Sequence, residues 1–222
     1  MQIRKIFILL LCVVITHSSA LRDKQQRIVV IDPSGDAKRV GRSIGDSFER
    51  GLTLQAVEKI KEMIEERAPH IKVIVTRMPG DTVYDLQNAT LTNRLQADLF
   101  INLNFYYTQE TKPTMYIYQF SYGNDFAFCE QGIALHTYDQ AYRINKDQTT
   151  ILAELCKKEL TQQQYQSIYM VSGPYSLPIK PLIGVIAPSI AFDLGLKSKD
   201  WWKYYTEPLV SGIIALIDGL SS

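Results

Sequence analysis

Carboxylate and amide side chains follow three apolar segments of this chain, and groups of these types are suited to hydrolytic chemistry. When they converge, they are able to hold a metal ion or to act as general acid or base. Glu49 adds a further carboxylate at the start of a predicted helix. The apolar segments and their polar residues are 27–32 with Asp36, 98–104 with Asn104, and 188–195 with Asp193.

These segments are predicted to be strands of a mostly parallel sheet. Residues 27–32 form a continuous apolar run, which is typical of a strand buried on both faces. Apolar residues at three- and four-residue steps predict an amphipathic helix through 54–64 that ends before Pro69, and 71–76 reads as the next strand. This alternation predicts an α/β three-layer sandwich with a mostly parallel central sheet and helices on both faces. Ligands of such sheets bind beyond the carboxyl ends of the strands, so the polar residues are expected to form one site there.

The remaining segments complete this layout. Helices are predicted over 84–96, 148–160 and 209–220, a further strand over 114–121, and a long loop or insertion over 122–146. Four prolines between 174 and 188 predict an extended segment that leads into the last strand.

The first twenty residues have the composition of a secretory signal peptide. Arg4 and Lys5 precede an apolar stretch over 6–15, and Ser18-Ser19-Ala20 resembles a cleavage site. The apolar stretch is shorter than the about 20 residues that a membrane span needs, although a retained N-terminal anchor is the alternative. We expect a signal peptide at 1–20, a single α/β domain over 21–222, and a periplasmic or secreted protein.

The charge balance argues against a nucleic-acid partner, and the cysteines permit a disulfide. The 222 residues contain 24 Lys and Arg against 23 Asp and Glu, without a long run of one sign, so nucleic acid is not an expected partner. Cys129 and Cys156 permit one disulfide in an exported protein. Cys156 lies on the apolar side of its predicted helix, so a buried free thiol is the alternative.

In their order along the chain, the motifs at the strand ends resemble those of the zinc-dependent N-acetylmuramoyl-L-alanine amidases, which cleave peptidoglycan. Ile31-Asp-Pro-Ser-Gly-Asp36 is similar to the family's Ile-Asp-Pro-Gly-His-Gly-Gly, and Asp193-Leu-Gly195 to its Glu-Leu-Gly-Phe. Val75-Thr-Arg77 and the run from Asn93 to Ile101 also look like family segments. The resemblance spans nearly all of 21–222 and implies the amidase fold.

The resemblance also implies a catalytic site, from which this sequence departs. Family enzymes hold zinc with two His and one Glu and use a second Glu as general base. Here Gly35 and Asn104 occupy the His positions, Glu49 is the only family ligand retained, and Asp193 stands at the general-base position. We therefore expect no zinc cofactor and a degenerate site, in which Asp36, Asn104 and Arg77 contact substrate.

The favoured hypothesis is an amidase-like cell-envelope protein that has lost catalysis and binds peptidoglycan or muropeptide fragments, or regulates a wall-processing partner. One alternative is an active amidase with a rearranged or oxygen-rich metal site that uses Glu49, Asp193 and His136, with Zn²⁺ as its cofactor. The other is an envelope protein–protein interaction module with residues 105–145 as its interface.

Overall fold

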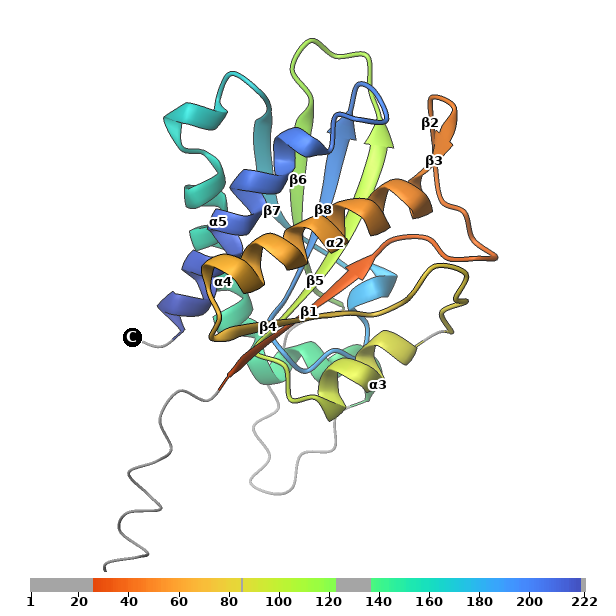
Figure 1. Ribbon diagram of the computed structural model, residues 1–222. Helices are drawn as coiled ribbons and strands as arrows, with labels where there is room; N and C mark the ends of the chain where they lie inside the picture. Colours follow the sequence, from red (N-terminus) through yellow and green to blue (C-terminus); the bar gives the residue numbers. More distant parts are fainter. Residues whose placement is uncertain (1–25, 85, 123–136, 221–222) are drawn as a thin grey trace, which may run out of the picture.

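The computed structural model describes residues 26–84, 86–122 and 137–220, and a six-stranded sheet lies at its centre (Figure 1). In spatial order the strands are β4 (Ile71–Val75), β1 (Arg27–Pro33), β5 (Leu99–Tyr107), β8 (Ser189–Leu196), β6 (Thr114–Phe120) and β7 (Met170–Leu177). Strands β1, β4, β5 and β8 are parallel, β6 runs antiparallel to β8, and β7 is parallel to β6. The predicted α/β fold with a mostly parallel sheet is confirmed.

Helices pack on both faces of the sheet. The larger apolar core lies between one face and the helices α2 (Glu49–Arg67), α4 (Lys146–Leu160) and α5 (Lys203–Gly219). A smaller core on the opposite face includes residues of α3 (Gln87–Arg94) and of the short 3-10 helices η1 (Tyr138–Asn145) and η3 (Lys180–Leu182). The remaining elements are η2 (Gln163–Tyr165) and a small hairpin of β2 (Ser43–Ile44) and β3 (Ser47–Phe48).

The alternation of side chains along the strands explains why one face carries the polar residues. In β5, Leu103 and Phe105 enter the larger core, whereas Phe100 enters the smaller one. Because successive side chains of a strand point to opposite faces, Asn102 and Asn104 lie on the same face as Phe100. The smaller core therefore occupies the first half of this face, and polar side chains occupy the half toward the strand ends.

Several elements differ in detail from the predictions. The extended segment predicted from Pro174 onward begins as strand β7, which was not predicted and which tolerates Pro174 because it is an edge strand. Helix α5 begins at Lys203 rather than Leu209, and η1 lies within the predicted loop 122–146. Helix α3 begins only at Gln87, because Leu86 adopts a left-handed conformation with φ of 62° that interrupts the predicted helix 84–96.

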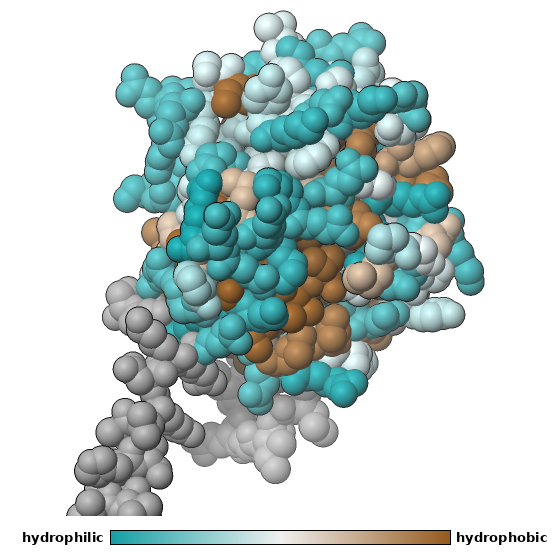
Figure 2. Space-filling model, viewed as in Figure 1, coloured by the Kyte–Doolittle hydropathy of each residue, from teal (hydrophilic) through white to brown (hydrophobic). Residues whose placement is uncertain are grey.

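The surface over α2 is mostly hydrophilic (Figure 2), as expected for a helix with one buried side. Within the described ranges, no helix is both long enough and apolar enough to cross a membrane. Cys156 is a free thiol, and burial raises its pKa to about 12, with a smaller contribution from Glu159. The predicted signal peptide 1–20, Cys129 and His136 lie outside the described residues.

Candidate functional site

The carboxyl ends of the central strands bring three of the predicted site residues to one edge of the sheet. Asn104 on β5 and Asp193 on β8 are direct neighbours in the parallel register. Glu49 is the first residue of α2, and its carboxylate accepts a hydrogen bond from the backbone N–H of Phe105, one residue beyond Asn104. Residues more than a hundred positions apart in the sequence therefore meet at this edge.

The Glu49 carboxylate is enclosed by backbone. Its side chain is only 3% exposed, and its two oxygens accept the N–H groups of Phe105 at 2.8 Å and Arg42 at 2.9 Å. Gly41 lies against this carboxylate with φ of +76°, and a Cβ added there would come within 2.7 Å of Oε2. Only glycine allows the loop before α2 to pass so close, so the loop is shaped around Glu49.

The Arg42 side chain places a positive charge among these residues. Its Nη1 lies 2.6 Å from Oδ1 of Asp193 and donates to the carbonyl oxygen of Phe105 at 3.2 Å. Burial by itself would lower the pKa of Arg42, but the carboxylates of Asp193 and Glu49 outweigh it and raise the pKa. Arg42 is therefore a fixed cation at the ends of β5 and β8.

A chain of hydrogen bonds links Asn104 to the end of β1. The Asn104 amide donates to Asn102 Oδ1 at 2.6 Å and to the carbonyl oxygen of Phe192 at 3.0 Å. Asn102 in turn donates to Asp32 Oδ2 at 2.8 Å, and the Thr76 hydroxyl donates to Asp32 Oδ1 at 2.6 Å. Burial raises the pKa of Asp32, and the hydrogen bonds from Thr76 and Asn102 oppose this effect. The network fixes the orientation of both asparagine side chains.

Gly35 and Asp36 belong to the loop that follows β1. Gly35 has φ of +80°, and a Cβ added there would lie 2.7 Å from the Cβ of Arg50, so a side chain is disfavoured at this position. The carboxylate of Asp36 is turned into its own loop, where it accepts the backbone N–H groups of Lys38 and Arg39 and the guanidinium of Arg39.

Arg77, predicted to contact substrate, is 5% exposed and bound to the backbone. Its Nε donates to the carbonyl oxygen of Pro33 at 3.1 Å, and its Nη2 donates to those of Ser34 at 3.3 Å and Arg50 at 2.7 Å. The guanidinium thus ties the loop after β1 to the first turn of α2.

The residues that the sequence resemblance implies at the zinc positions, Gly35, Asn104 and Glu49, do not fit a zinc ion. A catalytic zinc site takes about three protein ligands, with imidazole nitrogen prominent. Gly35 offers no side chain, the Asn104 amide nitrogen is a donor in two hydrogen bonds, and both oxygens of Glu49 are bound by backbone N–H groups. The described residues include no group of three or more His, Cys, Asp or Glu that could hold a metal, and His70 lies elsewhere, bound to Asp218.

A row of tyrosine rings continues the polar face across β5, β6 and β7. Neighbouring ring centroids lie 6.0 to 6.3 Å apart. Tyr116 is the register neighbour of Asp193, so the row begins beside the Arg42 ion pair. The pKa of Tyr118 is raised, mainly by burial and to a smaller extent by the charge of Asp193. The Tyr118 hydroxyl therefore stays protonated. In order along the row the residues are Tyr106, Tyr116, Tyr118 and Tyr175.

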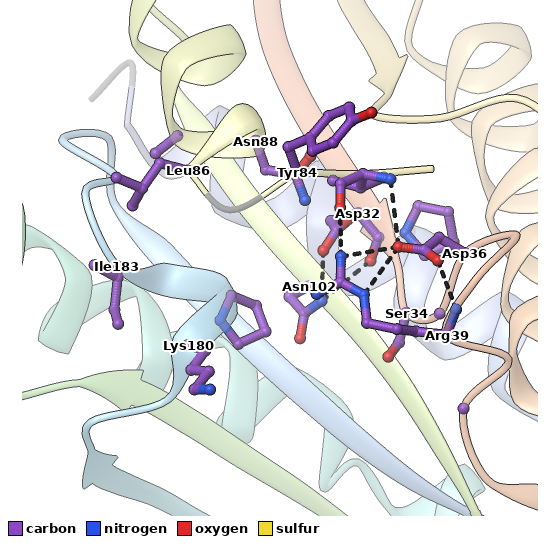
Figure 3. A pocket seen from close by; sticks show the side chains of 16 residues that line it. Asp32, Ser34, Asp36, Arg39, Tyr84, Leu86, Asn88, Asn102, Lys180 and Ile183 are labelled. Atoms are coloured by element: carbon purple, nitrogen blue, oxygen red, sulfur yellow. Dashed lines mark hydrogen bonds and ion pairs between the residues drawn. The ribbon is translucent and has the colours of Figure 1, made fainter. Parts of the chain in front are cut away.

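A cavity of about 450 Å³ lies beside Asn102, over the middle of β5 and the carboxyl end of β1 (Figure 3). Figure 3 shows Asp32 and Asn102 on one side of it and Leu86 and Ile183 on the opposite side. The cavity is not lined by any of the ion-paired residues or their neighbours at the sheet edge, namely Glu49, Arg42, Asn104 and Asp193. The strand ends therefore carry two neighbouring features, the ion-paired edge with the tyrosine row and the cavity.

Arg42, Asn102 and Asn88 were not among the residues predicted from the sequence. Asn102 had a detectable signal, since Asn102, Asn104 and Tyr106 recur at every second position of a predicted strand and so share one face. Arg42 and Asn88 lie in a loop and at the start of a short helix, and their positions depend on the path of the backbone.

No family model matches this chain, and no curated protein matches it in sequence. Its fold, however, is similar to those of solved N-acetylmuramoyl-L-alanine amidases. The N-acetylmuramyl-L-alanine amidase Ami1 from Mycobacterium smegmatis aligns with a TM-score of 0.63 at 13% identity, over 88% of this chain and 99% of that one. AmiC2 of Nostoc punctiforme gives 0.62 at 14% identity, over 88% and 99%. The CwlD amidase from Clostridioides difficile, in complex with the GerS lipoprotein, gives 0.59 at 14% identity, over 86% and 98%. The chain therefore has the α/β fold of N-acetylmuramoyl-L-alanine amidases.

Proposed function

We propose that this protein is an exported, catalytically inactive protein with the amidase fold that binds peptidoglycan or muropeptide fragments at the ends of β5 and β8. The observation that carries the proposal is the Arg42 guanidinium, which pairs with Asp193 at 2.6 Å while backbone N–H groups occupy both oxygens of Glu49. A guanidinium in this place opposes the binding of a metal ion. Among the described residues only its Nη1 is engaged as a side-chain donor, so its other N–H groups are able to donate to oxygens of wall peptides.

The tyrosine row supplies a second element of this binding surface. Tyrosine rings offer flat apolar area with a hydroxyl at the edge, a combination that suits the faces and hydroxyl groups of sugars. The rings come from β5, β6 and β7, and because β8 lies between β5 and β6 the row spans four strands of the sheet. Adjacent strands lie about 4.8 Å apart, so the row suits an elongated ligand. A glycan on the tyrosines would carry its peptide branches past Arg42.

The proposal predicts binding without hydrolysis. We expect the purified protein to co-sediment with sacculi and to release no free amine from them, with or without added zinc. Release of amine that a chelator abolishes would instead establish the alternative of an active amidase with a rearranged metal site. Failure to sediment, combined with capture of a specific envelope protein, would favour the interaction-module hypothesis. CwlD, one of the structural neighbours, is in complex with a lipoprotein.

Removing one ring of the row should weaken this binding. We expect Tyr118→Ala to reduce the affinity for sacculi by about fivefold to tenfold, because a stacked ring contributes roughly 1 kcal/mol. Tyr204→Ala is a matched control, because Tyr204 is 54% exposed and lies on α5, whose core face packs on the opposite side of the sheet. The measurement is a sedimentation isotherm for each variant. Equal losses in both variants would exclude the row as the binding surface.

A further inference from the structure

Strand β4 forms one edge of the sheet and lies next to α2 (Figure 1). Its sequence, Ile-Lys-Val-Ile-Val, has a β-branched apolar residue at four of its five positions, a composition that favours pairing with a further strand. The N–H and C=O groups on the free side of an edge strand are a template for such pairing. By composition and position, β4 is therefore a strand at which two copies of this chain are able to join.

The hydrogen bonds to β1 show which backbone groups of β4 face away from the sheet. The N–H of Thr76, which directly follows β4, donates to the carbonyl oxygen of Ile31 on β1 at 3.1 Å. Because the backbone groups of successive residues in a strand point to opposite sides, Ile74 faces β1 as Thr76 does. The N–H and C=O groups of Val73 and Val75 therefore face outward.

Two side chains of α2 bind the outward groups of Val73. The carboxylate of Glu65 accepts the Val73 N–H at 3.0 Å, and Nζ of Lys61 donates to the Val73 carbonyl oxygen at 2.8 Å. Lys61 also donates to Glu65 at 2.6 Å. Burial by itself would raise the pKa of Glu65, but the hydrogen bonds from Lys61 and from the Val73 N–H outweigh it and lower the pKa. Glu65 is therefore an ionised acceptor, and neither backbone group of Val73 is open to an incoming strand.

A second ion pair on α2 shows that this arrangement is more than an ordinary surface contact. Lys59 and Glu62 also pair at 2.8 Å, but their side chains are 48% and 64% exposed and bind no strand backbone among the described residues. The side chains of Lys61 and Glu65 are only 32% and 30% exposed, because they lie against the edge of the sheet. The opposite edge strand, β7, contains Pro174, which has no N–H to offer. Each edge of the sheet thus carries a feature that opposes pairing.

We propose that Lys61 and Glu65 form a cap on Val73 that prevents β4 from pairing with β4 of a second copy of this chain. With the cap in place, an incoming strand meets only the outward groups of Val75. Without it, the groups of Val73 and Val75 form a row to which an antiparallel β4 adds, so that one sheet continues through both copies. Two strands separate β4 from β8 and the Arg42 surface, so the cap does not depend on the proposed function.

Sedimentation velocity of the full-length protein over a range of concentrations tests the cap. We expect the unaltered protein to sediment as a monomer. The double variant Lys61→Ala and Glu65→Ala should form a dimer as the concentration rises, because both outward groups of Val73 are then open. The double variant Lys59→Ala and Glu62→Ala removes the same charges from the same helix and should remain monomeric. A capless variant that is folded by circular dichroism yet stays monomeric, or a control that associates equally, would overturn the proposal.

Hydrogen exchange of the backbone amides locates the association. In the capless variant at low concentration, protection of the Val73 amide should fall by about tenfold, since the amide has lost its acceptor. In the dimer, the amides of Val73 and Val75 should both become protected as they pair with the second copy. A dimer in which neither amide is protected would assign the association to another surface and contradict the proposal.

A single variant keeps the test decisive if the double variant does not fold. Lys61→Ala opens the Val73 carbonyl oxygen and leaves the Glu65 acceptor in place, so it should dimerise about tenfold more weakly than the capless variant is expected to. In that case, a folded Lys61→Ala protein that stays monomeric at every concentration would refute the cap.

Discussion

Replacement of Glu49 by alanine is expected to lower the free energy of unfolding by about 3 kcal/mol, since one buried and one partly buried N–H group lose their acceptor and each costs about 1–3 kcal/mol. Those N–H groups belong to Arg42 and Phe105, which lie 2.9 and 2.8 Å from the carboxylate oxygens. The loss also removes the group around which the loop before α2 is folded. Urea denaturation followed by circular dichroism measures the change.

Glu58→Ala is the matched control for this prediction. Glu58 lies on the same helix but is exposed, so its replacement should change stability by no more than about 0.5 kcal/mol. The metal content of both variants and of the unaltered protein, measured after incubation with zinc, separates a structural role from a ligand role. Stoichiometric zinc that disappears in Glu49→Ala, without loss of stability, would show that Glu49 is a metal ligand and would refute our account of the site.

The fold was predictable because its signals are local and repeated. Continuous apolar runs marked β1 and β5, and three- and four-residue spacing marked α2. The rule that parallel strands end at one edge was then sufficient to bring Asn104 and Asp193 together, which their register confirms. Long-range placement thus followed from topology without any contact being known.

The partners of the site residues were not predictable in the same way. The sequence gives no sign that Arg42 reaches Asp193, 151 positions away, because that contact depends on the path of a glycine-containing loop. The burial of Arg77 was not predictable either, because an arginine after a strand is usually exposed. It is buried here because the packing of α2 brings backbone carbonyl groups to its guanidinium. Which polar group is free to meet a ligand is therefore decided by loops, where sequence patterns are weakest.

Asp36 is an example of a polar side chain at the strand ends whose hydrogen bonds stabilise the neighbouring loops. Its carboxylate is 2% exposed and accepts the backbone N–H groups of Lys38, Arg39 and Val83, the last of which belongs to the loop before α3. Burial would raise the pKa of Asp36, but the hydrogen bonds from the backbone and guanidinium of Arg39 prevail and hold the pKa well below its usual range. The ionised carboxylate joins two loops that line the cavity.

Asp36→Asn is therefore expected to lower the free energy of unfolding by about 2 kcal/mol at pH 7, because charge-assisted hydrogen bonds are replaced by weaker ones or lost. Since the folded-state pKa is depressed, this contribution is fully present above the unfolded pKa of about 3.9 and disappears as the pH falls toward the folded value. Denaturation curves at pH 7, 4 and 3 should show the difference between the two proteins shrinking as the pH falls. The exposed Asp147→Asn is the control, with a small difference at every pH. A difference for Asp36→Asn that stayed constant down to pH 3 would mean that the charge of Asp36 does not hold the loops together.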